Sequence, residues 1–184
     1  MIHKDYLVYV RTVIAAFALA ACVSAPAGAS LAVGTDAPTF TAQATLGGKI
    51  FTFDLADSLK KGPVVLYFYP AAFTKGCTLE AHDFADHMSD YTALGATVIG
   101  VSMDGIAKLQ KFSVSECRSK FPVASDAGKS ISKEYDAQLL MGLYANRTSY
   151  VISPAGKIVY AYTALDYSKH VANTLAAVKK LEGK

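Results

Sequence analysis

Residues 63–77 read PVVLYFYPAAFTKGC, and they carry the clearest structural signal in the chain. The first seven residues are β-branched, aromatic or otherwise apolar, without the polar alternation of a strand that has one face in water. Such a run is typical of a strand covered on both faces. From Pro70 the residues become small or polar, and beyond Cys77 the apolar residues recur with helical spacing. The stretch therefore predicts a buried strand, a short connection and a helix whose first turn holds Cys77.

Strands and helices alternate on both sides of this stretch. The other predicted strands are 39–45 and 50–53, which form a hairpin, 96–103, 122–125, 150–152 and 158–162. The predicted helices are 77–94, 104–120 with Asp104 as its cap, 129–135, and a last helix to residue 181 with Ser168 as its cap. This order predicts an α/β sandwich, with a central mixed sheet flanked by helices and an N-terminal β-hairpin. A chain of 184 residues with 52% hydrophobic residues suits one such domain and excludes disorder.

The first 29 residues are predicted to be a secretory signal peptide. A positively charged start precedes an uncharged apolar segment at 12–23, and the sequence AGA at 27–29 is typical of a cleavage site. A competing interpretation is a lipoprotein signal that ends before Cys22, whose thiol would then carry a lipid anchor. Either way we expect an exported protein, periplasmic or lipid-anchored, whose domain covers residues 30–184.

Charge and cysteine content exclude several classes of protein. The formal net charge is only +3 and the charged residues are scattered, so there is no positive surface for nucleic acid. Three cysteines are too few for a disulfide scaffold and lack the spacing of a zinc site, so neither a metal nor another cofactor is predicted. Cleavage of the signal would leave Cys77 and Cys117, and two thiols in an oxidising compartment need a chemical explanation.

Cys77 is the candidate nucleophile because the first turn of a helix stabilises an anion. Unpaired backbone N–H groups and the positive end of the helix dipole point at this position. They favour the thiolate, which is the reactive form of cysteine. Thr74 can direct its hydroxyl into the same pocket. Arg147 comes just before the predicted strand 150–152, at an edge that would face the helix start, and its fixed fork of donors suits an anionic site.

Taken together, these residues resemble the peroxiredoxins of the AhpC/TSA superfamily. The segment VLYFYP at 65–70, followed by Thr74 and by CTLE at 77–80, is similar to the bacterioferritin-comigratory-protein or PrxQ subgroup. The agreement extends to Gly34, Ala37, Pro38, Phe40, 100–104, 121–126, Arg147 and 150–152. The resemblance implies a thioredoxin-like fold and a thiol-dependent, antioxidant peroxidase that reduces hydrogen peroxide and organic hydroperoxides. It also implies regeneration by a thioredoxin-like dithiol or a small-molecule thiol.

The resemblance further implies a role for each residue of the site. Cys77 would be the peroxidatic cysteine, which attacks the O–O bond and becomes a sulfenic acid. Thr74 would hold the peroxide oxygen, and Arg147 would stabilise the thiolate and the developing negative charge. Pro70 would shield the sulfur from water, and Glu80 would brace the cysteine loop. We expect a monomer or a weak dimer.

The chain departs from many members of the subgroup at the resolving cysteine. Those proteins carry it five residues after the peroxidatic cysteine, where this chain has His82. Cys117, in the predicted helix 104–120, is the remaining candidate for a disulfide with Cys77, and some members place their resolving thiol in the equivalent helix. Cys117 can equally be a small buried core residue, in which case an outside thiol would reduce the sulfenic acid. Both interpretations stay open on the sequence.

Two other functions fit the same fold class. An exported thioredoxin-like thiol–disulfide oxidoreductase needs Cys-x-x-Cys, but position 80 is Glu. A metallochaperone that binds copper needs Cys-x-x-x-Cys, but position 81 is Ala. Both are therefore less favoured than a peroxidase.

Overall fold

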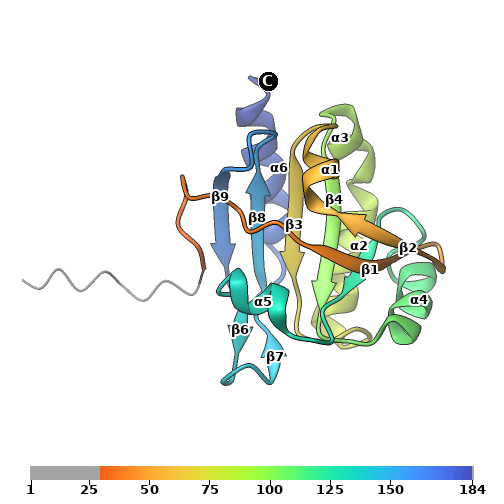
Figure 1. Cartoon of the computed structure of the whole chain (residues 1–184). Coiled ribbons are helices and arrows are strands. Elements are labelled where there is room, and N and C mark those ends of the chain that lie inside the picture. The colour runs from red at the N-terminus through yellow and green to blue at the C-terminus, as the bar shows by residue number, and fades with distance from the viewer. Residues whose placement is uncertain (1–29, 184) are drawn as a thin grey trace, which may run out of the picture.

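The computed structural model describes residues 30–183, so the predicted export signal and Cys22 lie outside the described residues. A seven-stranded sheet organises this part of the chain, in the order β2-β1-β5-β4-β3-β8-β9 (Figure 1). The strands of this sheet are β1 (Thr41–Leu46), β2 (Lys49–Asp54), β3 (Val64–Phe68), β4 (Thr97–Ser102), β5 (Val123–Ser125), β8 (Thr148–Ile152) and β9 (Ile158–Thr163). β3 is parallel to β4 and antiparallel to β8. The predicted mixed sheet is therefore confirmed, and so is the N-terminal hairpin, which is formed by β1 and β2.

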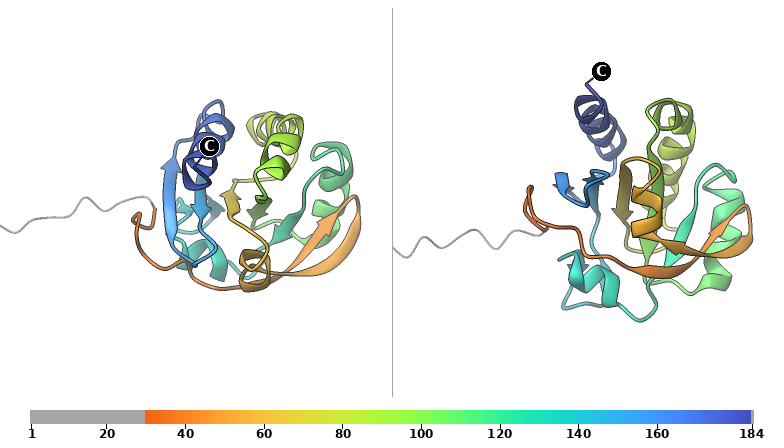
Figure 2. Two further views of the ribbon diagram at one scale, coloured as in Figure 1. Left: turned by 90° about the horizontal axis from the view of Figure 1, so that it is seen from above. Right: turned by 45° about the horizontal axis from the view of Figure 1, so that its top comes forward.

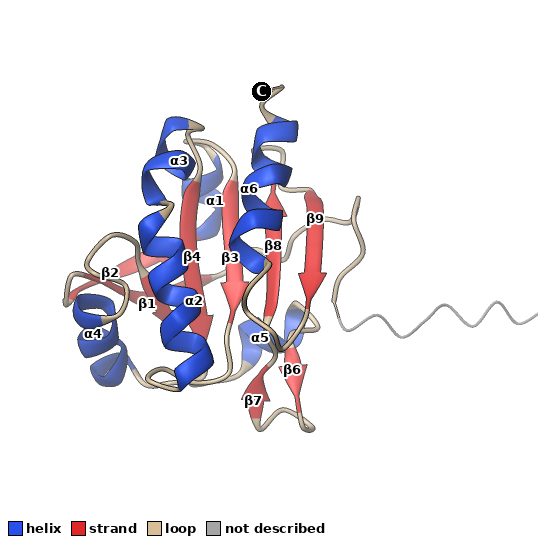
Figure 3. Ribbon diagram, turned by 180° about the vertical axis from the view of Figure 1, so that it is seen from behind, coloured by secondary structure: helices blue, strands red, loops and turns tan. Residues whose placement is uncertain are grey.

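Helices cover both faces of the sheet. One face carries α2 (Lys75–Asp86), α3 (Met88–Ala93), α4 (Ile106–Ser115) and α6 (His170–Leu181), as Figure 3 shows from behind. The other face carries α1 (Leu55–Leu59) and α5 (Ser130–Glu134). The view from above in Figure 2 separates α6 and α2 from α1 across the sheet. This arrangement is the predicted α/β sandwich.

Strand β3 lies at the centre of this sandwich and divides its side chains between two cores. Val65 and Tyr67 pack into the core under α2 and α6. Leu66 and Phe68 point the other way, into the core that includes α1. Because successive side chains of a strand alternate between faces, a strand covered on both sides must be apolar at every position. This is why residues 63–69 show no polar alternation.

The predicted helix 77–94 is two helices in the structure. α2 starts at Lys75, two residues earlier than expected, and the chain leaves helical geometry at His87, which precedes α3. The His87 ring nitrogen Nδ1 lies 2.9 Å from the carbonyl oxygen of Asp83. The backbone N–H of His87 also donates to the carbonyls of Asp83 and Phe84, so α2 completes its last turn there before α3 begins. Cys77 remains in the first turn, as predicted.

The predicted helix 104–120 is shorter at both ends. α4 ends at Ser115, so Cys117 lies in the turn after the helix and not within it. Arg118 and Ser119 have left-handed backbone angles, with φ of 51° and 54°, and a right-handed helix cannot continue through them. The N–H of Ser119 instead donates to the carbonyl of Ser113, which closes the turn.

Neither predicted side-chain cap is present. Gly105 is the N-cap of α4, because the Asp104 carboxylate is used elsewhere, and Lys169 is the N-cap of α6. The backbone N–H and hydroxyl of Ser168 bind Asp166 instead. The sequence reasoning also missed α1 and a small hairpin of β6 (Gln138–Leu139) and β7 (Tyr144–Ala145). These elements are short, and two-residue strands give no periodicity to detect.

Close packing of Tyr67 against Gly100 gives a test of this core. The two residues are partners across β3 and β4, and a Cβ added to Gly100 would lie 2.7 Å from the Tyr67 ring. Tyr67 cannot move away easily, because its ring also stacks on Phe84 with centroids 4.3 Å apart. We expect Gly100→Ala to lower the free energy of unfolding by about 1–3 kcal/mol, measured by urea denaturation. Gly128→Ala is the control, since an added Cβ there meets nothing within 4 Å. Equal stability of the two variants would contradict the packing described.

Candidate active site

The site forms where β3 passes into α2. Thr74 is the N-cap of α2 and Cys77 is its third residue, only 2% exposed. At this position the sulfur lies beside backbone N–H groups that have no partner inside the helix. The helix dipole places partial positive charge at the same end. The local fold therefore favours an anionic sulfur in a nearly closed environment.

Arg147 lies against this sulfur. Strand β8 runs antiparallel to β3, with Thr148 opposite Phe68, so the residue before β8 reaches the end of β3 where α2 begins. The Arg147 Nη2 lies 3.4 Å from Cys77 Sγ, within hydrogen-bond range of a sulfur. Gly76 permits this approach, because a Cβ there would lie 3.2 Å from Nη2. The structure thus brings together the two residues that the sequence placed on separate elements.

The rest of the Arg147 guanidinium is also held. Its Nε donates to the carbonyl of Leu165 at 2.9 Å, and its Nη1 forms a salt bridge with Glu80. Burial opposes the charge of Arg147, but Glu80 and Cys77 outweigh it and raise the pKa of the guanidinium. A planar fork held on three sides cannot rotate away from the sulfur. The positive charge at Cys77 is therefore fixed in direction.

Glu80 is fully buried one turn after Cys77. Burial raises the pKa of its carboxyl to about 8, although Arg147 opposes the shift. The family resemblance implies that Glu80 braces the cysteine loop. In the structure its carboxylate contacts Arg147, so any bracing of the loop passes through that side chain.

Thr74 and Pro70 lie on the connection between β3 and α2. The hydroxyl of Thr74 is exposed and donates to the carbonyl of Ala71 at 2.9 Å, which leaves its oxygen free to accept a further hydrogen bond. Pro70 is half-buried and directly follows the buried residues 63–69. Both residues are on the segment that leads into the helix start.

Two residues that hold this connection were not predicted. The Asp104 carboxylate accepts a 2.7 Å hydrogen bond from the N–H of Ala72. Phe73 has a left-handed φ of 69° and packs edge-on against Phe112. The ends of adjacent parallel strands meet at one edge of a sheet, so the position of Asp104 just after β4 was an available signal.

Cys117 has a different environment from Cys77. It is fully buried in the same apolar core cluster as Cys77, and both thiols are free. Burial, with a further effect of Glu116, raises the pKa of the Cys117 thiol well above its usual value. The residues on either side of it are tied to α2. Glu116 pairs with His82 at 2.9 Å and Arg118 pairs with Asp86.

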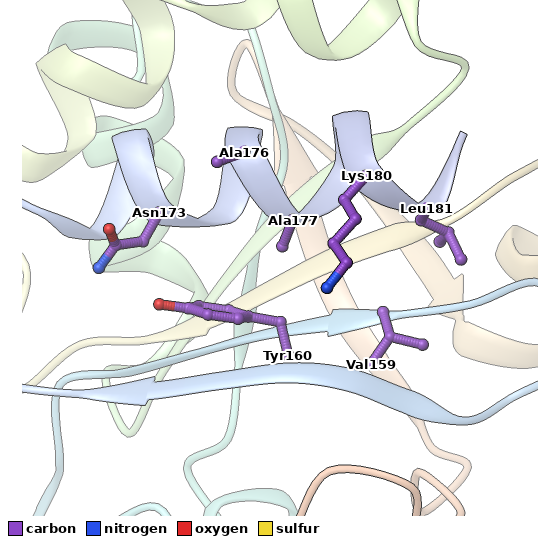
Figure 4. Close-up of a pocket in the computed structure, with 7 residues that line it drawn as sticks. All are labelled: Val159, Tyr160, Asn173, Ala176, Ala177, Lys180 and Leu181. Atoms are coloured by element: carbon purple, nitrogen blue, oxygen red, sulfur yellow. The ribbon is translucent and has the colours of Figure 1, made fainter. Parts of the chain in front are cut away.

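A separate pocket of about 570 Å³ opens between β9 and α6, lined by residues that include Tyr160, Asn173 and Lys180 (Figure 4). It contains none of the predicted site residues and no carboxylate or thiol. Within residues 30–183 there is no group of side chains that could hold a metal ion. In that same range no helix combines the length and apolar character needed to cross a membrane.

Comparison with known proteins gives a consistent result. Residues 33–161 match the AhpC/TSA family. The chain is 38% identical to the chloroplastic peroxiredoxin Q of Triticum aestivum, across 66% of this chain and 57% of that protein. It is 30% identical to peroxiredoxin Bcp of Xanthomonas campestris, across 70% of this chain and 90% of that one. The crystal structure of peroxidoxin BcpB from Mycobacterium tuberculosis superimposes with a TM-score of 0.73 at 29% identity, covering 81% of this chain and 97% of that one.

The buried carboxyl of Glu80 gives a pH-dependent prediction. Its pKa is about 8 in the native state against 4.5 normally, so the native state binds more protons than the unfolded state between these values. Its contribution to stability is therefore complete below about pH 4.5 and is lost as the pH rises through about 8. From pH 7 to 8.5 we expect the free energy of unfolding of the wild type to fall relative to Glu80→Gln by about 1 kcal/mol.

Urea denaturation at several pH values measures this difference. The window above pH 7 avoids His170, whose pKa burial lowers to about 4 and whose effect has the opposite sign. Glu134→Gln, on the exposed end of α5, is the control and should run parallel to the wild type. Parallel curves for Glu80→Gln and the wild type would contradict the prediction.

Proposed function

This chain belongs to the AhpC/TSA family, in its PrxQ/Bcp subgroup, and is a thiol-dependent peroxidase; from that premise we propose that Cys77 is its peroxidatic residue. The observation that carries the proposal is the 3.4 Å contact between Arg147 Nη2 and Cys77 Sγ at the start of α2. A buried thiolate needs a fixed cation and hydrogen-bond donors beside it, and this position supplies both. The substrates are hydrogen peroxide and organic hydroperoxides.

In the first step the Cys77 thiolate attacks one oxygen of the peroxide. The S–O bond forms as the O–O bond breaks, so the sulfur is oxidised to a sulfenic acid and the peroxide is reduced to an alkoxide or hydroxide. The leaving oxygen takes a proton from water and departs as an alcohol or as water. Arg147 stabilises the negative charge that spreads over the reacting atoms. The Thr74 oxygen accepts a hydrogen bond from the peroxide, and Pro70 limits the access of water to the sulfur.

Cys117 is the resolving thiol in this proposal. Its sulfur attacks the sulfenic acid, a Cys77–Cys117 disulfide forms and water leaves. A thioredoxin-like dithiol then reduces the disulfide. Support comes from the shared core cluster of the two cysteines and from the turn that holds Cys117. Two adjacent left-handed residues store strain in this turn, and only two side-chain pairs tie it to α2.

The proposal includes export of the protein. The charged start, the apolar segment at 12–23 and the AGA sequence at 27–29 support a signal peptide and a periplasmic enzyme. Lipidation at Cys22 is the alternative. Mass determination of the protein recovered from its native cell distinguishes cleavage after Ala29 from a lipid on Cys22.

Loss of the sulfur tests the peroxidatic role directly. We expect Cys77→Ser to abolish peroxide consumption, because a serine hydroxyl stays protonated at neutral pH and is a poor nucleophile towards peroxide oxygen. The measurement is peroxide-dependent oxidation of a dithiol reductant. Cys117→Ser is the matched control and should still consume one equivalent of peroxide in a single turnover. Turnover that survives Cys77→Ser would refute the proposal.

The resolving role has a separate test. After one equivalent of peroxide, we expect peptide mapping by mass spectrometry to find Cys77 joined to Cys117. The double variant Glu116→Ala with Arg118→Ala removes both ties to α2, so it should form the disulfide several-fold faster without a change in the rate of the first step. Recovery of Cys77 as sulfenic or sulfinic acid, with Cys117 still a free thiol, would assign resolution to an outside thiol.

A further inference from the structure

One carboxylate oxygen in the site lacks a hydrogen-bond partner. Glu80 Oε2 is paired with Arg147, but Oε1 is buried and makes no hydrogen bond. A buried polar atom left in this way costs about 1–3 kcal/mol. His170, the first residue of α6, lies close to it, with its Nδ1 3.8 Å from Oε1. The side chains of Glu80 and His170 are both fully buried.

The contacts of His170 define which of its nitrogens carries a hydrogen. Nε2 lies 3.0 Å from the carbonyl oxygen of Ala164, which can only accept, so Nε2 is the donor. Nδ1 of the neutral ring is therefore an acceptor with a single lone pair, and Glu80 can donate to it only when the Ser149 hydrogen points elsewhere. The Ser149 hydroxyl lies 2.8 Å from Nδ1 and can rotate its hydrogen towards it or away from it. Nδ1 can consequently receive a proton that Glu80 carries on Oε1.

Burial favours the uncharged form of both groups, and the charged neighbours have smaller effects. Glu80 is buried and faces Arg147 and Asp83, and its pKa is raised to about 8, mainly by burial. His170 faces Arg147 and Asp166 and packs against the Tyr162 ring, and burial is the main cause of its lowered pKa of about 4. Both shifts favour the uncharged forms, a protonated acid beside a neutral imidazole.

We infer that His170 is a positioning residue for the reaction at Cys77: a proton held between Glu80 Oε1 and His170 Nδ1 neutralises Glu80 and leaves the Arg147 charge to the sulfur. The inference rests on the proposed role of Cys77. A movement of about 1 Å would bring the two atoms into hydrogen-bond distance. An ionised Glu80 would compete with the Cys77 thiolate for the same guanidinium, whereas a protonated one still accepts the hydrogen bond from Nη1.

Two substitutions of His170 separate its two nitrogens. His170→Gln can keep the bond to the Ala164 carbonyl but loses Nδ1. His170→Asn places a polar group near the position of Nδ1 but loses the contact with Ala164. At pH 7 we expect His170→Gln to react about tenfold more slowly with hydrogen peroxide and with iodoacetamide at Cys77, because an ionised Glu80 then competes for Arg147. His170→Asn should lose less than threefold. Mass spectrometry of the Cys77 peptide measures both rates.

A double-mutant cycle tests whether the effect passes through Glu80. Glu80→Gln is permanently uncharged, so adding His170→Gln in that background should change either rate less than twofold. The pH profile adds a second readout. Above about pH 8 the wild-type rates should fall relative to those of Glu80→Gln, because the carboxyl ionises. A structural role for His170 alone would not produce this pH dependence.

Two results would overturn the inference. Equal losses in His170→Gln and His170→Asn, with equal losses of thermal stability, would show that the ring serves packing only. A tenfold effect that persists in the Glu80→Gln background would show that His170 does not act through Glu80. Failure of the peroxidase proposal has its own signature, turnover that survives Cys77→Ser. In that event the iodoacetamide rates still decide the role of His170.

Discussion

A negative charge kept inside a protein requires a positive charge that cannot move away from it. In this chain the pair is the Cys77 sulfur and the Arg147 guanidinium, 3.4 Å apart. The sheet order provides the contact, because β8 runs beside β3 in the opposite direction and returns to the start of α2. The strand pairing, the two-sided core around β3 and the glycine before the cysteine all serve this one contact.

The two cysteines show how strongly position controls the chemistry of one side chain. Cys77 and Cys117 share a core cluster and are almost equally buried. Cys77 has a helix start and an arginine beside it, whereas Cys117 follows a helix end and has Glu116 as its neighbour. A helix start favours an anion, while a helix end and an adjacent carboxylate oppose one. The two thiols therefore have opposite electrostatic surroundings although they share one core.

Much of this site could be predicted from the sequence because its residues lie at the ends of strongly patterned elements. Cys77 and Arg147 flank two apolar strands, and strand ends are easy to place. The predictions failed where side chains compete for backbone groups. Asp104 fits a helix cap in the sequence but binds the Ala72 N–H, and Ser168 fits another but binds Asp166. His170 gave no signal, since its importance depends on a contact with Glu80, ninety residues earlier in the chain.

The hydrogen bond from Arg147 to Glu80 has a consequence for the movement of α2. A disulfide with Cys117 requires the first turn of this helix to unwind, but Glu80 lies one turn further on and is anchored through Arg147 to the segment after β9. Unwinding of α2 from its first turn is therefore expected to end before Glu80, because that residue is held in place. The remainder of α2 can stay folded while the three residues before Glu80 unwind and carry the Cys77 sulfur outward. The first turn can then re-form on the folded part of the helix once the thiols are free again.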